Sequence, residues 1–210
     1  MNTACTLVVN AGGQSRRMGE PKALLSVPPT NEPLLATIIR RLRGVAPEPV
    51  LVIANDPQIR AMVQLDEAVS WLRDRYVDVG PLGGIATALA AVDGWAIVVA
   101  CDMPLLNPEL LRHLRSIADE VDAAGADCWD AVVPVVNGFP EPLHALYHAR
   151  ALAAVEARLA AGQRRATAFL SDVRVRYVSE AEMRPHDPAL HSFLNVNTPA
   201  EWAHVRQLLS

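Results

Sequence analysis

The feature that most constrains the fold is a set of short apolar runs, each followed at once by glycine or polar residues. The runs are Thr6–Asn10, Val50–Asn55 and Ala96–Cys101. Their continuous apolar character and β-branched content are typical of strands buried on both faces of a parallel sheet. Between them lie segments such as Pro33–Arg43, where apolar residues recur at helical spacing. Buried strands that alternate with helices predict an α/β fold with a mostly parallel sheet.

The rest of the chain extends this pattern. Asn107 and Pro108 are an N-cap and a first-turn proline for a helix that reaches about Asp119. Thr198 and Glu201 have the spacing of a capping box, so the last helix is expected to start near Pro199. Further strands are expected at 131–135, 143–147 and 173–178, and further helices at 58–65, at 150–161 and after a glycine break at 80–84.

Size and composition favour a single domain in a reducing compartment and argue against nucleic-acid-binding, membrane and disulfide-rich proteins. We expect residues 1–210 to form a single domain, because this length supports one sizeable core and no linker interrupts it. The net charge of −4 and the lack of a basic run argue against nucleic acid as a partner. The sequence predicts no signal peptide and has no apolar run of about 18 residues, so no membrane contact is expected. The cysteines, Cys5, Cys101 and Cys128, form no C-x-x-C motif, which favours a reduced cytoplasmic location without a zinc site.

The loop after the first predicted strand carries glycines and then basic residues. Gly12 and Gly13 allow a sharp turn with exposed backbone N–H groups, and Arg16, Arg17 and Lys22 add positive charge close by. This combination suits a polyphosphate better than a merely solvated surface turn. The loop matches neither G-x-x-x-x-G-K-[ST] nor G-x-G-x-x-G, so a P-loop or an ordinary dinucleotide site is disfavoured.

One carboxylate follows another predicted strand, at the sheet edge where ligands of α/β folds bind, and two more lie before the glycine turn. Asp102 follows the run Ala96–Cys101 and is a candidate Mg²⁺ ligand, the alternative being a turn-forming aspartate. Asp74 and Asp78 precede the glycine turn. Either carboxylate could accept bonds from a ribose or from guanine N–H groups, although spacing alone favours solvated loop aspartates.

Two pairs of polar residues in the second half of the chain allow both a functional and a structural interpretation. Asn195 and Asn197 lie on one face of an extended segment, where they either bind a ligand or stabilise the turn into the last helix. His144 and His148 are four residues apart, but no third metal ligand is evident, so a structural role is favoured. No Ser/His/Asp or Cys/His constellation stands out.

Taken together, the motifs resemble the molybdenum cofactor guanylyltransferase (MobA) family of nucleotidyltransferases. "AGGQSRRMGEPKALL" is similar to the family's signature loop, "DVGPLGGIATAL" to its G-P-L-x-G-I helix start and "VVACDMPLL" to its metal-aspartate segment. "EPLHALYH" and "AGQRRA" resemble later segments, and "FLNVNTPAEW" resembles the terminal F-x-N-x-N-T-P. The motifs occur in the family's order along nearly the whole chain.

This resemblance implies a Rossmann-like nucleotidyltransferase domain with a mixed sheet flanked by helices. It implies Mg²⁺-dependent transfer of GMP from GTP to the phosphate of molybdenum-loaded molybdopterin, with molybdenum-insertion proteins and recipient molybdoenzymes as partners. Lys22, Asp102 and Arg16 would serve catalysis, and Asp102 would hold the metal. The residues that would contact the nucleotide or the pterin are Asn10, Ala11, Gly12, Gly13, Arg17, Lys22, Asn55, Asp74, Asp102, Asn195 and Asn197.

The chain departs from the family pattern in ways that bear on base choice. Asn10 stands where the family usually has Leu, and Glu20-Pro21 replaces the usual Asp before Lys22. Asn55 is the candidate for an Asn that some members carry where Ile53 stands. "MGEPK" resembles relatives that use CTP, whereas "GPLGG" and "NVNTP" favour guanylyl transfer. The alternatives are a CTP-dependent enzyme, one with a sugar phosphate acceptor, and a non-catalytic nucleotide-binding adaptor.

Overall fold

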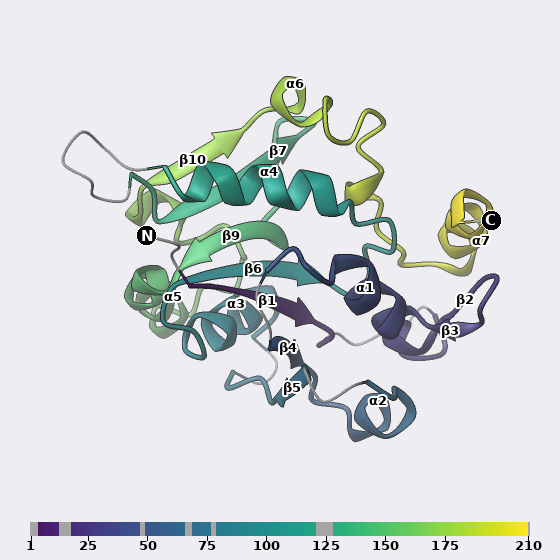
Figure 1. Cartoon of the computed structure of the whole chain (residues 1–210). Coiled ribbons are helices and arrows are strands. Elements are labelled where there is room, and N and C mark those ends of the chain that lie inside the picture. Colours follow the sequence, from purple (N-terminus) through teal and green to yellow (C-terminus); the bar gives the residue numbers. More distant parts are fainter. Residues whose placement is uncertain are drawn as a thin grey trace.

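A computed structural model describes residues 4–12, 18–46, 49–65, 69–76, 79–120 and 128–209 of the chain. Its centre is an eight-stranded sheet with the order β10-β7-β9-β6-β1-β4-β5, in which β8 also pairs with β7 (Figure 1). The strands are β1 (Cys5–Asn10), β4 (Val50–Ile53), β5 (Val69–Leu72), β6 (Trp95–Ala100), β7 (Ala131–Val136), β8 (Phe139–Pro140), β9 (His144–His148) and β10 (Val175–Val178). A separate pair, β2 (Ser26–Val27) and β3 (Glu32–Pro33), is antiparallel.

The sheet is mixed but mostly parallel, as predicted. β1 lies between β6 and β4 and is parallel to both, and β5 and β10 also pair in parallel with their neighbours. β9 runs antiparallel to β6 and β7, and β8 is antiparallel to β7. The carboxyl ends of β1, β4 and β6 therefore meet at one edge.

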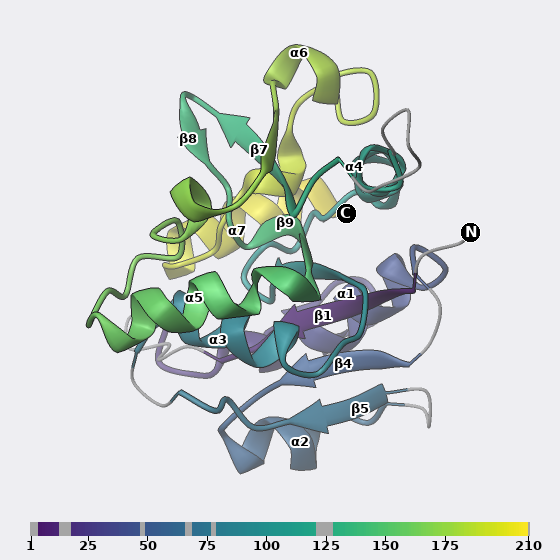
Figure 2. The same ribbon diagram turned by 90° about the vertical axis from the view of Figure 1, so that its left-hand side faces the viewer.

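Helices cover both faces of the sheet because the side chains of each strand alternate between them. Along β1, Leu7 and Val9 enter one core and Val8 enters the other. The first core lies under α1 (Leu34–Leu42) and α4 (Pro108–Ala118), and also takes in Trp202 and Val205 of α7 (Pro199–Leu209). The second lies under α3 (Pro81–Leu89) and α5 (Leu152–Ala160), which pack side by side (Figure 2).

The predicted capping residues are confirmed. The Asn107 side chain accepts a hydrogen bond from the N–H of Glu109 at the start of α4. Thr198 and Glu201 form the reciprocal bonds of a capping box, so α7 begins at Pro199. These short-range signals fixed both helix starts because a cap needs only a few neighbouring residues.

Other expectations need correction. The glycine segment at 80–84 does not break the chain before a helix. α3 already begins at Pro81, so Gly83 and Gly84 lie within its first turns. α2 (Pro57–Met62) starts and ends earlier than predicted, with Asp56 as its N-cap. A short 3-10 turn, Ala149–Ala151, precedes α5.

Several short elements had no prediction. They are β5, β8, the pair β2 and β3, and α6 (Glu180–Met183). These elements are too short for a clear hydrophobic period, and their pairing depends on neighbours distant in the sequence. Among the described helices, none has the length and apolar content needed to cross a membrane.

Candidate active site

The candidate site lies at the edge where β1 and β6 end. The carbonyl of Asn10, the last residue of β1, accepts a hydrogen bond of 3.0 Å from the N–H of Cys101 just after β6. The next residue, Ala11, donates its N–H to the carbonyl of Ile53 at 2.9 Å. The backbone of the glycine loop is thus tied to both neighbouring strands, and Asp102 follows directly beside it.

Lys22, Asp102 and Asn197 meet at this edge although they are far apart in the sequence. The ammonium group of Lys22 lies 2.9 Å from Oδ2 of Asp102 and donates to Oδ1 of Asn197 at 2.7 Å. The N–H of Val196 also donates to the carbonyl of Asp102 at 2.9 Å, which holds the segment before α7 against the end of β6. Three of the predicted site residues therefore form one connected cluster.

The cluster is partly open to solvent. The side chains of Lys22 and Asp102 are 19% and 28% exposed. Cys101, next to Asp102, is buried. Burial and then the charge of Asp102 raise the pKa of its thiol, which disfavours the thiolate form that a nucleophilic cysteine needs.

The donor set around Asp102 fits a Mg²⁺ ion held mainly by a substrate. In the part of the chain that the structure describes, no hydrogen bond reaches its second oxygen, Oδ1. The described residues contain no cluster of three or more metal-ligating side chains that could hold an ion alone. Mg²⁺ is commonly bound by one or two carboxylates together with phosphate oxygens and waters. Asp102 could therefore supply one protein ligand.

Asn10 organises the start of the glycine loop. Its side chain is buried, and Oδ1 accepts the N–H of Gly12 at 3.0 Å. The side chain also lies against Gly84 of α3, where a Cβ atom would come within 2.3 Å of Nδ2. The departure from the usual Leu at this position therefore adds a hydrogen bond within the loop. Gly84 supplies the space for it, a role that sequence spacing did not reveal.

Asp74 and Asn55 belong to a network near the ends of β4 and β5. Oδ1 of Asp74 accepts the hydroxyl of Thr87 at 2.8 Å and the N–H of Tyr76 at 3.0 Å. Asn55 accepts the N–H of Asp74 at 2.9 Å. Both side chains thus shape this loop, and their predicted contact with a nucleotide stays a prediction. The sequence predicts Thr87 only as part of a helix and gives no sign of this contact.

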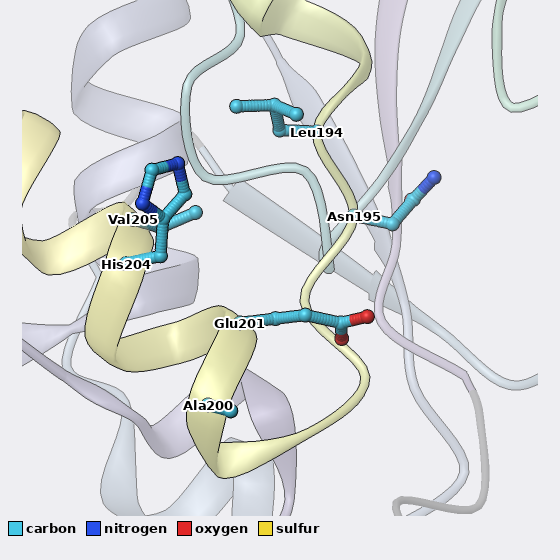
Figure 3. Close-up of a pocket in the computed structure, with 6 residues that line it drawn as sticks. All are labelled: Leu194, Asn195, Ala200, Glu201, His204 and Val205. Carbon is cyan, nitrogen blue, oxygen red and sulfur yellow. The ribbon is translucent and has the colours of Figure 1, made fainter.

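Asn195 and Asn197 flank a buried valine, as expected for one face of an extended segment. Asn197 reaches Lys22, whereas Asn195 is exposed. Asn195 borders a small, mainly apolar hollow against α7, together with Leu194, Ala200, Glu201, His204 and Val205. Figure 3 shows its side chain directed away from His204 and Val205. The structure brings only Asn197 into the lysine cluster.

Some predictions fall outside the described residues, namely those on Gly13, Arg16, Arg17 and Asp78. The two histidines, His144 and His148, have different surroundings. His144 is fully buried against Phe193, and His148 accepts a hydrogen bond from the N–H of Arg150 and packs edge-on against Trp95.

Comparison with known sequences is consistent with this architecture. The model of the MobA-like NTP transferase domain matches residues 7–178. The probable molybdenum cofactor guanylyltransferase of Methanothermobacter thermautotrophicus is 34% identical over 96% of this chain and 98% of its own. The molybdenum cofactor guanylyltransferase of Syntrophotalea carbinolica is 32% identical over 95% of this chain and 90% of its own.

Solved structures share the fold. Molybdopterin-guanine dinucleotide biosynthesis protein A from Archaeoglobus fulgidus has a TM-score of 0.80 and 28% identity, covering 97% of both chains. A 2-C-methyl-D-erythritol 4-phosphate cytidylyltransferase from Thermus thermophilus has a TM-score of 0.65 over 100% of this chain and 99% of its own, but at 16% identity it shows the fold alone. Because the family model matches most of the chain and the relatives match it over nearly their full length, the chain belongs to the family of MobA-like NTP transferase domains.

Proposed function

We propose that this protein transfers GMP from GTP to the phosphate of molybdenum-loaded molybdopterin. The products are the molybdopterin guanine dinucleotide cofactor and pyrophosphate. The observation that carries the proposal is the cluster of Lys22, Asp102 and Asn197 beside the glycine loop, in a chain whose full-length relatives are named guanylyltransferases. We expect the reaction to take place in the cytoplasm, with molybdenum-insertion proteins and recipient molybdoenzymes as partners.

The reaction needs positioning more than a strong base. A phosphate oxygen of the acceptor attacks the α-phosphorus of GTP, the bond from that phosphorus to the bridging oxygen breaks, and its electron pair leaves with pyrophosphate. A phosphomonoester is largely ionised at pH 7, because its second pKa is about 6. The site accordingly requires no histidine base, and its task is to orient two anions and neutralise their charge.

The residues divide this task. The N–H groups of the loop at Gly12 and Gly13, with Arg16 and Arg17, would hold the β- and γ-phosphates. Lys22 would exchange its bond to Asp102 for the α-phosphate, where negative charge develops. Asp102 would hold Mg²⁺, which supplies further neutralisation of the phosphates when it is bound. Asn10, Ala11, Asn55 and Asp74 would line the nucleoside side, and Asn195 and Asn197 would face the acceptor.

The experiment that tests the proposal combines ligand stabilisation with turnover. GTP with Mg²⁺ should raise the unfolding temperature more than CTP, UTP or ATP does, since a ligand stabilises the state it binds. Pyrophosphate should then form only when molybdopterin is added. Preferential stabilisation by CTP would instead favour the cytosine dinucleotide as product. If none of the four nucleotides gives pyrophosphate in the presence of molybdopterin, the transferase assignment is refuted.

A further inference from the structure

Glu141 is a half-buried carboxylate without a described partner near the candidate site. It follows the hairpin of β7 and β8, and its backbone N–H donates to the carbonyl of Pro134 at 2.9 Å. No hydrogen bond or ion pair reaches its side chain from the described residues. Burial raises the pKa of its carboxyl group. Carboxylates withdrawn from water are normally paired with donors, so this one is suited to receive donors from a ligand.

The topology places Glu141 at the same sheet edge as Asp102. β9 is antiparallel to β6, with Val99 opposite His144, and the N–H of Ala100 donates to the carbonyl of Leu143 at 2.9 Å. Asp102 comes two residues after Ala100, and Glu141 comes two residues before Leu143. Figure 2 shows the hairpin of β7 and β8 on the side toward which the arrowheads of β1 and β4 point.

Glu141 lies on the opposite side of β6 from the proposed nucleoside contacts. Asn10, Asn55 and Asp74 follow β1, β4 and β5, whereas Glu141 lies between β7 and β9. If the triphosphate occupies the glycine loop and Lys22, the base extends toward β4 and β5. The half of the edge formed by β7 and β9 is then left for the acceptor.

The chemistry of the acceptor suits a carboxylate at this place. The ring of a pterin carries an N–H and an exocyclic amino group side by side, and one carboxylate can accept from both. Phe139 is 72% exposed and lies in β8, two residues before Glu141. An exposed aromatic ring offers a stacking surface for a flat heterocycle.

We propose that the Glu141 carboxylate accepts hydrogen bonds from the ring N–H and the neighbouring 2-amino group of the pterin acceptor, with Phe139 flanking the ring. This inference rests on the proposed function, because it takes the acceptor to be a pterin. It adds a specificity residue that recognises the acceptor ring, distinct from the groups that act on its phosphate.

The test measures recognition of the ring apart from turnover. Pterin and 4-hydroxypteridine, which lacks the 2-amino group, are titrated by fluorescence against the wild-type chain, Glu141→Gln and Asp93→Asn. Asp93 is an exposed aspartate just before β6, at the opposite edge of the sheet, so its substitution matches the change in charge. We expect wild type and Asp93→Asn to prefer pterin by about tenfold, and Glu141→Gln to lose that preference.

Steady-state kinetics provide the second readout. In Glu141→Gln, KM for molybdopterin should rise about tenfold while KM for GTP is unchanged. The inference is overturned if wild type does not discriminate between the two rings, if Glu141→Gln keeps the preference, or if KM for GTP rises instead, which would place guanine at Glu141. If wild type forms no pyrophosphate but its ring preference depends on Glu141, the proposed function fails and the pterin subsite stands.

Discussion

The side chain of Asn10 occupies space that exists only because residue 84 is glycine. Nδ2 of Asn10 would lie 2.3 Å, and Cγ 3.1 Å, from a Cβ atom on that helix turn. The same side chain accepts the N–H of Gly12 and so shapes the first turn of the proposed phosphate loop. The start of α3 and the glycine loop are therefore coupled through one buried amide.

Gly84→Ala should push the Asn10 side chain out of place. We expect a loss of about 1–3 kcal/mol in the free energy of unfolding, as for other overpacked sites, and weaker stabilisation by GTP. Urea unfolding and a GTP thermal-shift titration measure the two effects. The double variant Asn10→Ala with Gly84→Ala should regain part of the lost stability, because the clashing atoms are gone. Equal losses in the single and double variants would show that the contact is not the cause.

Lys22 and Asp102 should be essential for turnover but not for folding. Asp102→Ala is expected to abolish pyrophosphate release at saturating Mg²⁺ and GTP. Lys22→Ala should slow turnover about a hundredfold or more, the usual effect of losing one preorganised donor. Circular dichroism and urea unfolding should show a folded protein in both cases, because the ion pair is partly exposed and contributes little to stability.

A substitution in the same cluster provides the comparison. Asn197→Ala removes an acceptor from Lys22 but leaves its bond to Asp102. We expect a smaller loss of rate than in Lys22→Ala, since the charge remains. Near wild-type activity in Asp102→Ala would show that Asp102 is not the metal ligand. A mild effect in Lys22→Ala would show that Lys22 is a structural loop residue.

The central strands and the edge that carries the candidate site could be predicted from sequence, because each depends on local pattern. The runs that became β1, β4 and β6 are apolar at consecutive positions, so burial on both faces followed directly. The rule that ligands bind at the carboxyl ends of such strands then selected Asp102 and the glycine loop. Lys22 joins the predicted site because of its positive charge next to the glycines.

Long-range contacts escaped this reasoning. Nothing in the spacing of Gly84 shows that Asn10 packs against it, and a run of glycines predicts a chain break where the structure has the start of a helix. Likewise, the segment "EPLHALYH" predicts a strand but gives no sign of where the Glu141 carboxylate lies. Its position beside β6 depends on the antiparallel pairing of β9, which sequence periodicity does not specify.

Asp130 should make stability depend on pH in the acidic range. It accepts bonds from the backbone and guanidinium of Arg174 and from Arg150. Burial alone would raise its pKa, but these bonds and the charge of Arg150 hold the pKa of Asp130 well below its usual range. A carboxylate with a depressed native pKa stabilises the fold fully above its unfolded pKa of about 3.9, and the effect is lost as pH falls below that value.

Asp130→Asn should therefore cost about 2–3 kcal/mol at pH 7, in line with charged hydrogen bonds. The difference from wild type should shrink as urea unfolding is repeated below about pH 4. Asp172→Asn is the control, because Asp172 pairs with Arg158 at a more exposed site, with 34% of its side chain accessible against 12% for Asp130. A cost at pH 7 as large as that of Asp130→Asn would show that burial is not the deciding factor.

His144 should make the free energy of unfolding depend on pH in a higher pH range than Asp130 does. Its ring is fully buried against Phe193, and neither nitrogen has a described hydrogen-bond partner. Burial lowers its pKa to about 3, with Asp187 opposing the shift. At pH values between this pKa and the unfolded pKa of about 6.5, only the unfolded chain takes up the proton. The free energy of unfolding therefore decreases by up to about 1.4 kcal/mol for each unit by which the pH is lowered.

His144→Leu should remove this dependence while costing little at pH 7, because no hydrogen bond is lost and the ring's apolar contacts are replaced. Urea unfolding at several values between pH 7 and pH 4 compares the slopes of the two proteins. His148→Leu serves as the control, since His148 is only partly buried and its ring already has a hydrogen bond from Arg150. If wild type and His144→Leu lose stability in parallel over this range, the histidine is not held neutral by the fold.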